Sequence, residues 1–175
     1  KLCRALARIE IVKGKEREAA DSLLDILRCT PEVYDFGGEL VTVGNSGELV
    51  PQDEHSLRYF VGGLVQFWRW HKVPKGDPVE VLENPPVGVC KSILALGNNR
   101  HLKPLDAVIS APILRPDGSI LDSIGYDENT RLFFNIDEVV YSVPLNPTRE
   151  EALAALNIVW NVFETFPFVD PIARA

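Results

Sequence analysis

Hydrophobic residues recur at intervals of three and four, the spacing of an amphipathic helix, in four stretches of the chain. These stretches are residues 16–28, 53–64, 86–96 and 148–166. Asp53 stands where its carboxylate can cap the second helix, and Thr148 with Glu151 forms a capping box at the start of the fourth. The pattern therefore predicts three or four helices.

Short runs of apolar and β-branched residues, typical of strands, lie between the helical stretches. These runs are 6–12, 33–36, 39–43, 65–70, 107–109, 113–114, 120–121, 132–134 and 139–143. Gly37 and Gly38 can supply the positive φ of a two-residue hairpin turn, and residues 115–118, Arg-Pro-Asp-Gly, predict a second hairpin. We therefore expect an α+β fold, with the helices packed on short, mainly antiparallel strands.

The chain has 175 residues, which is enough for one compact module over 1–175. A helix followed by a hairpin occurs at 16–43 and again at 86–121. This repeat leaves open a division into two winged-helix-like halves, 1–82 and 83–175. The sequence contains no Met at all, so we expect it to be a piece of a longer polypeptide.

Charge is distributed unevenly around the net value of −7. Residues 106–175 contain 4 Lys and Arg against 11 Asp and Glu, whereas residues 51–105 contain 7 against 5. Only the middle of the chain is therefore predicted to attract a phosphate backbone. No apolar run approaches the roughly 20 residues of a membrane span, so no membrane partner is expected.

Three cysteines, Cys3, Cys29 and Cys90, lie far apart and form no C-x-x-C pair. An odd number at this spacing indicates buried thiols in a reducing compartment, so we expect a cytoplasmic protein. Asp117, Asp122 and Asp127 recur every five residues but lack the alternating oxygen ligands and final Glu of a calcium loop. We interpret them as turn formers.

The sequence contains no phosphate-binding glycine loop, no G-x-S-x-G elbow and no H-E-x-x-H pair. We therefore expect this piece to be non-catalytic, without a metal or cofactor of its own. A hydrolase is the remote alternative, which would need Asp117, Asp127 and His101 to converge in one pocket.

The stretch Trp68-Arg69-Trp70-His71-Lys72, followed by Lys75, interleaves aromatic rings with cations. Such rings stack on nucleobases while the cations contact phosphates. A strand that buries one tryptophan and leaves its charges in water accounts for the same residues, and the sequence alone favours this plainer interpretation. The candidate nucleic-acid-binding residues, some of them only assumed to share a face, are Trp68, Arg69, Trp70, Lys72, Lys75, Lys91, Arg100, His101 and Lys103.

Five strings of the sequence resemble one segment of the primase-helicase replication proteins of plasmids, phages and genomic islands. They are residues 36–41 (FGGELV), 111–120 (APILRPDGSI), 125–127 (GYD), 147–152 (PTREEA) and 166–169 (FPFV). In that family the segment lies between an N-terminal primase or toprim-type region and a C-terminal hexameric helicase ATPase, and the catalytic residues lie outside the segment. ATP and Mg²⁺ would therefore belong to the parent protein and not to this piece.

The resemblance implies a non-catalytic accessory module of a mobile-element DNA replication protein. Its expected role is to position single-stranded or forked DNA, or to couple neighbouring domains, with DNA and the adjacent helicase ATPase domain as partners. The alternative is a protein-interaction or oligomerisation module, including a homo-oligomer, that does not contact DNA. The acidic part 106–175 and the apolar helix predicted over 148–166 motivate this alternative.

Overall fold

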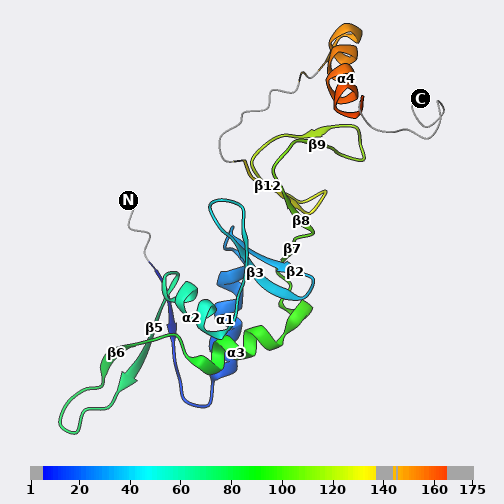
Figure 1. The fold of residues 1–175 in the computed structure, drawn as a ribbon. Helices are drawn as coiled ribbons and strands as arrows, with labels where there is room; N and C mark the ends of the chain where they lie inside the picture. Colours follow the sequence, from blue (N-terminus) through cyan, green and yellow to red (C-terminus); the bar gives the residue numbers. More distant parts are fainter. Residues whose placement is uncertain (1–5, 137–143, 145, 165–175) are drawn as a thin grey trace. The chain divides into compact units, whose positions relative to one another are not determined.

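The structure is a computed structural model that describes residues 6–136, 144 and 146–164. The chain divides into two compact units, residues 1–140 and 141–175. Helices and small, mostly antiparallel sheets alternate along it, so the predicted α+β class is confirmed (Figure 1). The helices are α1 (Glu16–Arg28), α2 (Glu54–Gly62), α3 (Val87–Ala95) and α4 (Arg149–Phe163), with a 3₁₀ turn at Gly97–Arg100. None of the helices in the described part is long and apolar enough to cross a membrane.

The strands of the described residues form four small sheets. The first holds β1 (Ala7–Glu10), β5 (Val65–His71) and β6 (Val79–Glu83), in that order. The second holds β4 (Leu49–Pro51), β3 (Glu39–Val43), β2 (Val33–Phe36) and β7 (Lys103–Pro104). The third holds β11 (Gly125–Asp127), β12 (Leu132–Phe134) and β8 (Ala107–Ile109), and the fourth pairs β10 (Ile120–Leu121) with β9 (Ile113–Leu114). Pairs β1–β5, β2–β7 and β8–β12 are parallel, and the others are antiparallel.

Several predicted elements have the expected boundaries because their signals are local. α1 occupies the predicted residues 16–28 and buries its apolar stripe. Asp53 caps α2, its carboxylate accepting from the Ser56 N–H at 2.7 Å while the Ser56 hydroxyl accepts from the Asp53 N–H at 2.8 Å. Gly37 and Gly38, at φ 59° and 93°, form the predicted turn between β2 and β3.

One hydrophobic core joins the three helices of the first unit to the first two sheets. Its buried members come from α1, α2 and α3, from β1, β2, β3 and β5, and from segments beside them, including Leu23, Leu57, Phe67, Ile93 and Leu102. The core therefore crosses position 82/83, where the sequence left open a division into halves. A second cluster packs Tyr34 against Tyr126 and Phe133, with ring centroids 5.1 and 6.0 Å away, and connects the second sheet to the third.

Several features of the structure differ from the expectations or lie beyond them. Residues 79–83, for which no element was predicted, form β6, and 49–51 and 103–104 form short strands as well. Cys90 is buried as predicted, but the prediction for Cys29 is wrong, because this residue follows the last turn of α1 on the solvent side. Cys3, the strand predicted at 139–143 and the last two residues of the fourth predicted helix, 165–166, lie outside the described residues.

A buried arginine joins the helical core to the β2–β3 hairpin. Arg100 is 2% exposed, and its guanidinium donates to the Ile93 carbonyl at 3.1 Å, the Gly38 carbonyl at 2.8 Å and the Asp35 carboxylate at 3.3 Å. Burial lowers the pKa of Arg100, and the neighbouring Asp35 carboxylate opposes that shift. The Asp35 carboxylate also accepts from the Gly38 N–H at 2.8 Å, so one ion pair connects the hairpin turn with the end of α3.

We predict that Arg100→Ala lowers the free energy of unfolding by about 3–5 kcal/mol, since it removes a buried guanidinium that is paired with the Asp35 carboxylate and bonded to two carbonyls. Urea unfolding followed by circular dichroism measures this. Lys91→Ala is the matched control, because the Lys91–Glu54 ion pair lies at the surface and its loss should cost about 1 kcal/mol or less. Equal costs for the two variants would contradict the role assigned to Arg100.

Candidate nucleic-acid interface

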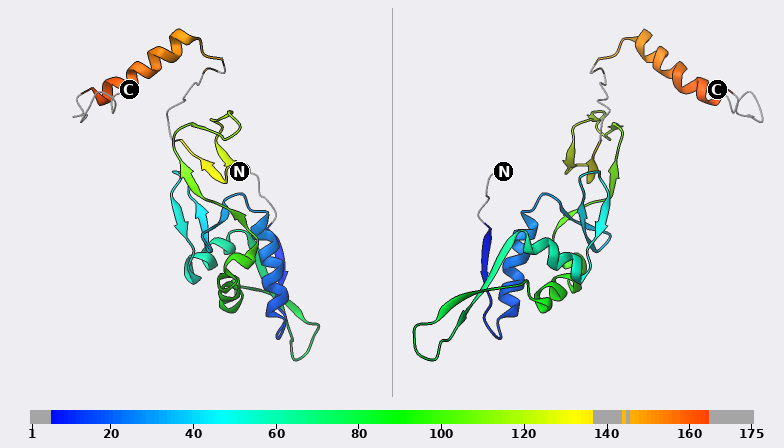
Figure 2. Two further views of the ribbon diagram at one scale, coloured as in Figure 1. Left: turned by 90° about the vertical axis from the view of Figure 1, so that its right-hand side faces the viewer. Right: turned by 60° about the vertical axis from the view of Figure 1, so that its left-hand side comes forward.

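The β5–β6 hairpin extends beyond the core of the first unit (Figures 1 and 2). β1 pairs with β5 only as far as Trp68, opposite Glu10, whereas β6 pairs with β5 as far as His71, opposite Val79. Residues 69–81 therefore form a two-stranded ribbon with its turn at the end. Buried side chains on β5 stop at Phe67, and the ribbon beyond is open to solvent.

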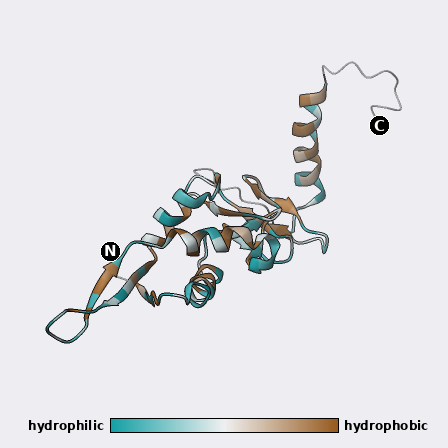
Figure 3. Ribbon diagram, turned by 90° about the horizontal axis from the view of Figure 1, so that it is seen from below, coloured by the Kyte–Doolittle hydropathy of each residue, from teal (hydrophilic) through white to brown (hydrophobic). Residues whose placement is uncertain are grey.

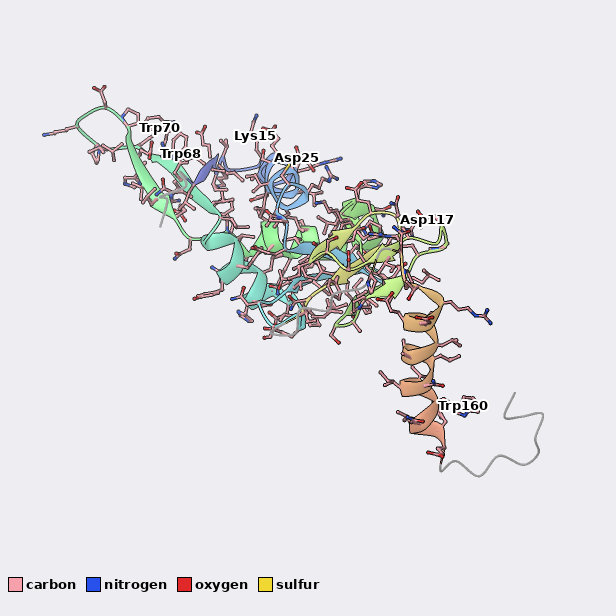
Figure 4. The ribbon with its side chains drawn as sticks, turned by 90° about the horizontal axis from the view of Figure 1, so that it is seen from above. Lys15, Asp25, Trp68, Trp70, Asp117 and Trp160 are labelled. Atoms are coloured by element: carbon pink, nitrogen blue, oxygen red, sulfur yellow. The ribbon has the colours of Figure 1, made fainter. Side chains whose placement is uncertain are left out.

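Trp68 and Trp70 occupy the same face of β5, because residues two apart in a strand point to the same side of the sheet. Their ring centroids are 5.4 Å apart and their planes meet at 83°, an edge-to-face contact (Figure 4). Leu82 stands opposite Trp68 on β6 and shares this face. Trp68 is half-buried, whereas Trp70 is 54% exposed, so Trp70 offers the larger free ring surface.

The cations near these rings are partly neutralised. Arg8 of β1 stands over the Trp68 ring, 5.2 Å from its centroid, and forms an ion pair with Glu80 of β6. Arg69, on the opposite face of the ribbon, pairs with Glu83 at 2.5 Å. These cross-strand pairs stabilise the ribbon but reduce the positive charge available to a phosphate.

The turn of the hairpin holds the remaining cations. Lys72 and Lys75 lie there, and within the described residues neither forms an ion pair. Trp70, Lys72, Asp77 and Pro78 line a shallow, mainly apolar hollow next to the turn. Five of the nine candidate residues thus lie on the hairpin, with Arg69 on the opposite face from the tryptophans: Trp68, Arg69, Trp70, Lys72 and Lys75.

The other four candidates lie on different elements. Lys91 is on α3 and pairs with Glu54 of α2 at 3.2 Å. Lys103, on β7, stands over the Tyr126 ring at 5.9 Å, and His101 is exposed in a left-handed conformation with φ 51°. Arg100 must be removed from the candidate interface, because it is buried and its donors are bound within the fold.

Sequence reasoning missed Arg8 and Leu82 as part of this face. Arg8 lies 60 positions before Trp68 in the sequence, and only the parallel pairing of β1 with β5 brings the two together. For Leu82 a signal was present, because Val79-Glu80-Val81 alternates in the way that predicts a strand.

Two of the three aspartates interpreted as turn formers, Asp117 and Asp127, hold the second predicted hairpin in place. The Asp117 carboxylate accepts from the Ser119 N–H at 2.9 Å, and Asp127 pairs with Arg115 at 3.0 Å. Hydrogen bonds from Thr130, and then from Arg115, hold the pKa of Asp127 below its usual value. Within the described residues no three His, Cys, Asp or Glu side chains gather as a metal site would require.

No family of known sequences, no curated protein and no solved structure matches this chain. The resemblance of its short strings to replication primase-helicases therefore stays a prediction.

Proposed function

We propose that this chain is a non-catalytic module of a mobile-element replication primase-helicase, and that it holds single-stranded DNA on the β5–β6 hairpin. The exposed Trp70, supported edge to face by Trp68 on a ribbon that extends beyond the core, carries this proposal. The resemblance described above supplies the replication context, and the hairpin supplies the contact surface.

A single strand fits this surface better than a duplex does. Every nucleobase of a single strand has an aromatic face that can stack on Trp70, whereas a duplex hides those faces between base pairs. Duplex binding depends mainly on neutralising phosphates, and the net charge of −7 and the paired Arg8 and Arg69 disfavour it.

The electrostatic contribution to the affinity is small, because Lys72 and Lys75 are the two cations of the hairpin that form no ion pair within the described residues. If Lys72 and Lys75 each contact one phosphate, the logarithm of the binding constant falls with the logarithm of salt concentration with a slope of about −1.4, because each phosphate of a single strand contributes about −0.7. Binding is therefore weak and depends on stacking.

We predict that Trp70→Ala weakens binding to a fluorescein-labelled oligothymidine of about 15 nucleotides by about 1–3 kcal/mol, the contribution of one stacked base. Fluorescence anisotropy at low salt measures the affinity. Trp70→Phe should retain most of it. Tyr59→Ala is the control, since Tyr59 is an aromatic residue of α2 that is 89% exposed and lies outside the hairpin. Equal affinities for wild type and Trp70→Ala would reject the proposal.

We predict that the double variant Lys72→Ala/Lys75→Ala brings the salt slope of the same titration close to zero, because the two unpaired cations of the hairpin are gone. Lys13→Ala, which removes an exposed lysine outside the hairpin, should leave the slope unchanged. If the affinity of the double variant still falls with salt concentration as steeply as that of wild type, other cations make the phosphate contacts.

Helix α4 supports a second candidate function, that of a protein-interaction module. Hydrophobic residues recur along this helix (Figure 3), and Leu156, Ile158 and Val162 among them are exposed. A helix of 15 residues is marginally stable alone in water, so packing against another surface would stabilise it. This function does not require the hairpin.

We predict for this second function that Leu156→Asp, which places a charge on the apolar surface of α4, weakens association with the protein that covers the helix. Sedimentation velocity of the chain, alone and mixed with the helicase ATPase domain of its parent protein, measures this. Arg149→Ala, which changes the first turn of the helix and leaves the apolar surface intact, is the control. Association that Leu156→Asp does not change would reject α4 as the contact.

A further inference from the structure

The outer edge of β1 carries backbone groups that the sheet does not use. β1 is an edge strand, and the Ile11 N–H donates to the Trp68 carbonyl at 2.7 Å. In a parallel ladder alternate residues bond to the same neighbour, so Ile9 and Ile11 point their backbone groups toward β5. The N–H and C=O of Arg8 and Glu10 consequently point away from β5, and the described residues include no backbone partner for them.

A groove follows this edge. The three consecutive residues of β1 that line it are Arg8, Ile9 and Glu10. The opposite wall of the groove is formed by the first turns of α1. Its residues are about one helical turn apart and are Lys15, which precedes the helix, Glu18, Ala19 and Ser22. Figure 4 shows Lys15 beside the end of β1, where α1 begins. Small side chains at positions 19 and 22 leave room for an extended chain next to the strand.

We infer that a second copy of this chain occupies the groove, pairing its β1 antiparallel to the first β1 about a two-fold axis at Ile9. Arg8 then stands opposite Glu10 of the second copy, and Glu10 stands opposite Arg8 of the second copy. Each of these opposed residues points its N–H and C=O outward, so the two pairs exchange four backbone hydrogen bonds.

The charges of the strand select this axis. An axis at Arg8 would place two arginines directly opposite each other, and an axis at Glu10 would place two glutamates opposite each other, which is destabilising. Of these three axes, the one at Ile9 is the one that opposes unlike charges. The ion pair of Arg8 with Glu80 does not prevent this, because a guanidinium has five N–H donors and the contact with Glu80 uses one nitrogen.

The resulting dimer has one continuous sheet, in the order β6-β5-β1-β1-β5-β6, and the two hairpins point in opposite directions. The pairing involves few residues, so its interface is smaller than the roughly 1,600 Å² of a standard complex and the association is weak. The inference does not depend on the proposed DNA contact, because the backbone edge of β1 and the face that carries Trp70 are different surfaces of the sheet.

Sedimentation equilibrium of the 175-residue chain, at concentrations up to about 1 mM, tests the inference. Wild type should show a monomer–dimer equilibrium. Arg8→Glu and Glu10→Arg should each weaken the dimer at least about tenfold, since each places like charges opposite each other. An equimolar mixture of the two variants should restore association, because unlike charges then face each other. Glu39→Arg, at an exposed position of β3 in another sheet, is the control.

A backbone variant separates edge pairing from side-chain effects. Glu10→Pro removes an N–H that points away from β5, so it should abolish dimerisation while circular dichroism stays unchanged. A wild-type monomer at every concentration would overturn the inference. Dimers that persist in Glu10→Pro would overturn it as well, and so would an equimolar mixture of Arg8→Glu and Glu10→Arg that fails to associate. An oligomer that is lost only in Leu156→Asp would overturn it in favour of a contact through α4.

Discussion

The ion pair between Arg100 and Asp35 is the interaction on which the arrangement of the first unit depends. A guanidinium presents several donors in a fixed plane, and here they contact the Ile93 carbonyl, the Gly38 carbonyl and the Asp35 carboxylate. The carbonyl of Arg100 in turn accepts from the side chain of Arg28 on α1. Two helices and one hairpin therefore meet at a single residue. The three acceptors are contacted by three different nitrogens of the planar group, whereas the three N–H donors of a lysine all diverge from one nitrogen.

The hairpin begins where this packed interior ends. Phe67 is the last buried residue of β5, and beyond it the ribbon is held by cross-strand pairs instead of a core. Those ion pairs stabilise an exposed element, but they also neutralise the two arginines whose positive charge would attract nucleic acid. Aromatic surface rather than electrostatic attraction therefore dominates what the hairpin can offer to a partner.

The first sheet presents two different surfaces to its surroundings. Its face carries Trp68 and Trp70, and its β1 edge carries the outward backbone groups of Arg8 and Glu10. Arg8 contributes to both, through its ring contact with Trp68 and through its backbone at the edge. Occupation of the edge by a second copy would leave the Trp70 ring accessible, so the two surfaces can act at the same time.

Local patterns in the sequence determined the helices α1 to α4, the cap at Asp53, the Gly37-Gly38 turn and the shared face of Trp68 and Trp70. Each of these depends on residues within a few positions of one another. Tertiary structure alone decided that Arg100 is buried, that Arg8 covers Trp68 and that β1 lies at the edge of its sheet among the described strands. The first two features join residues 60 or more positions apart, and the third depends on the order of strands in a sheet, so no spacing along the chain encodes them.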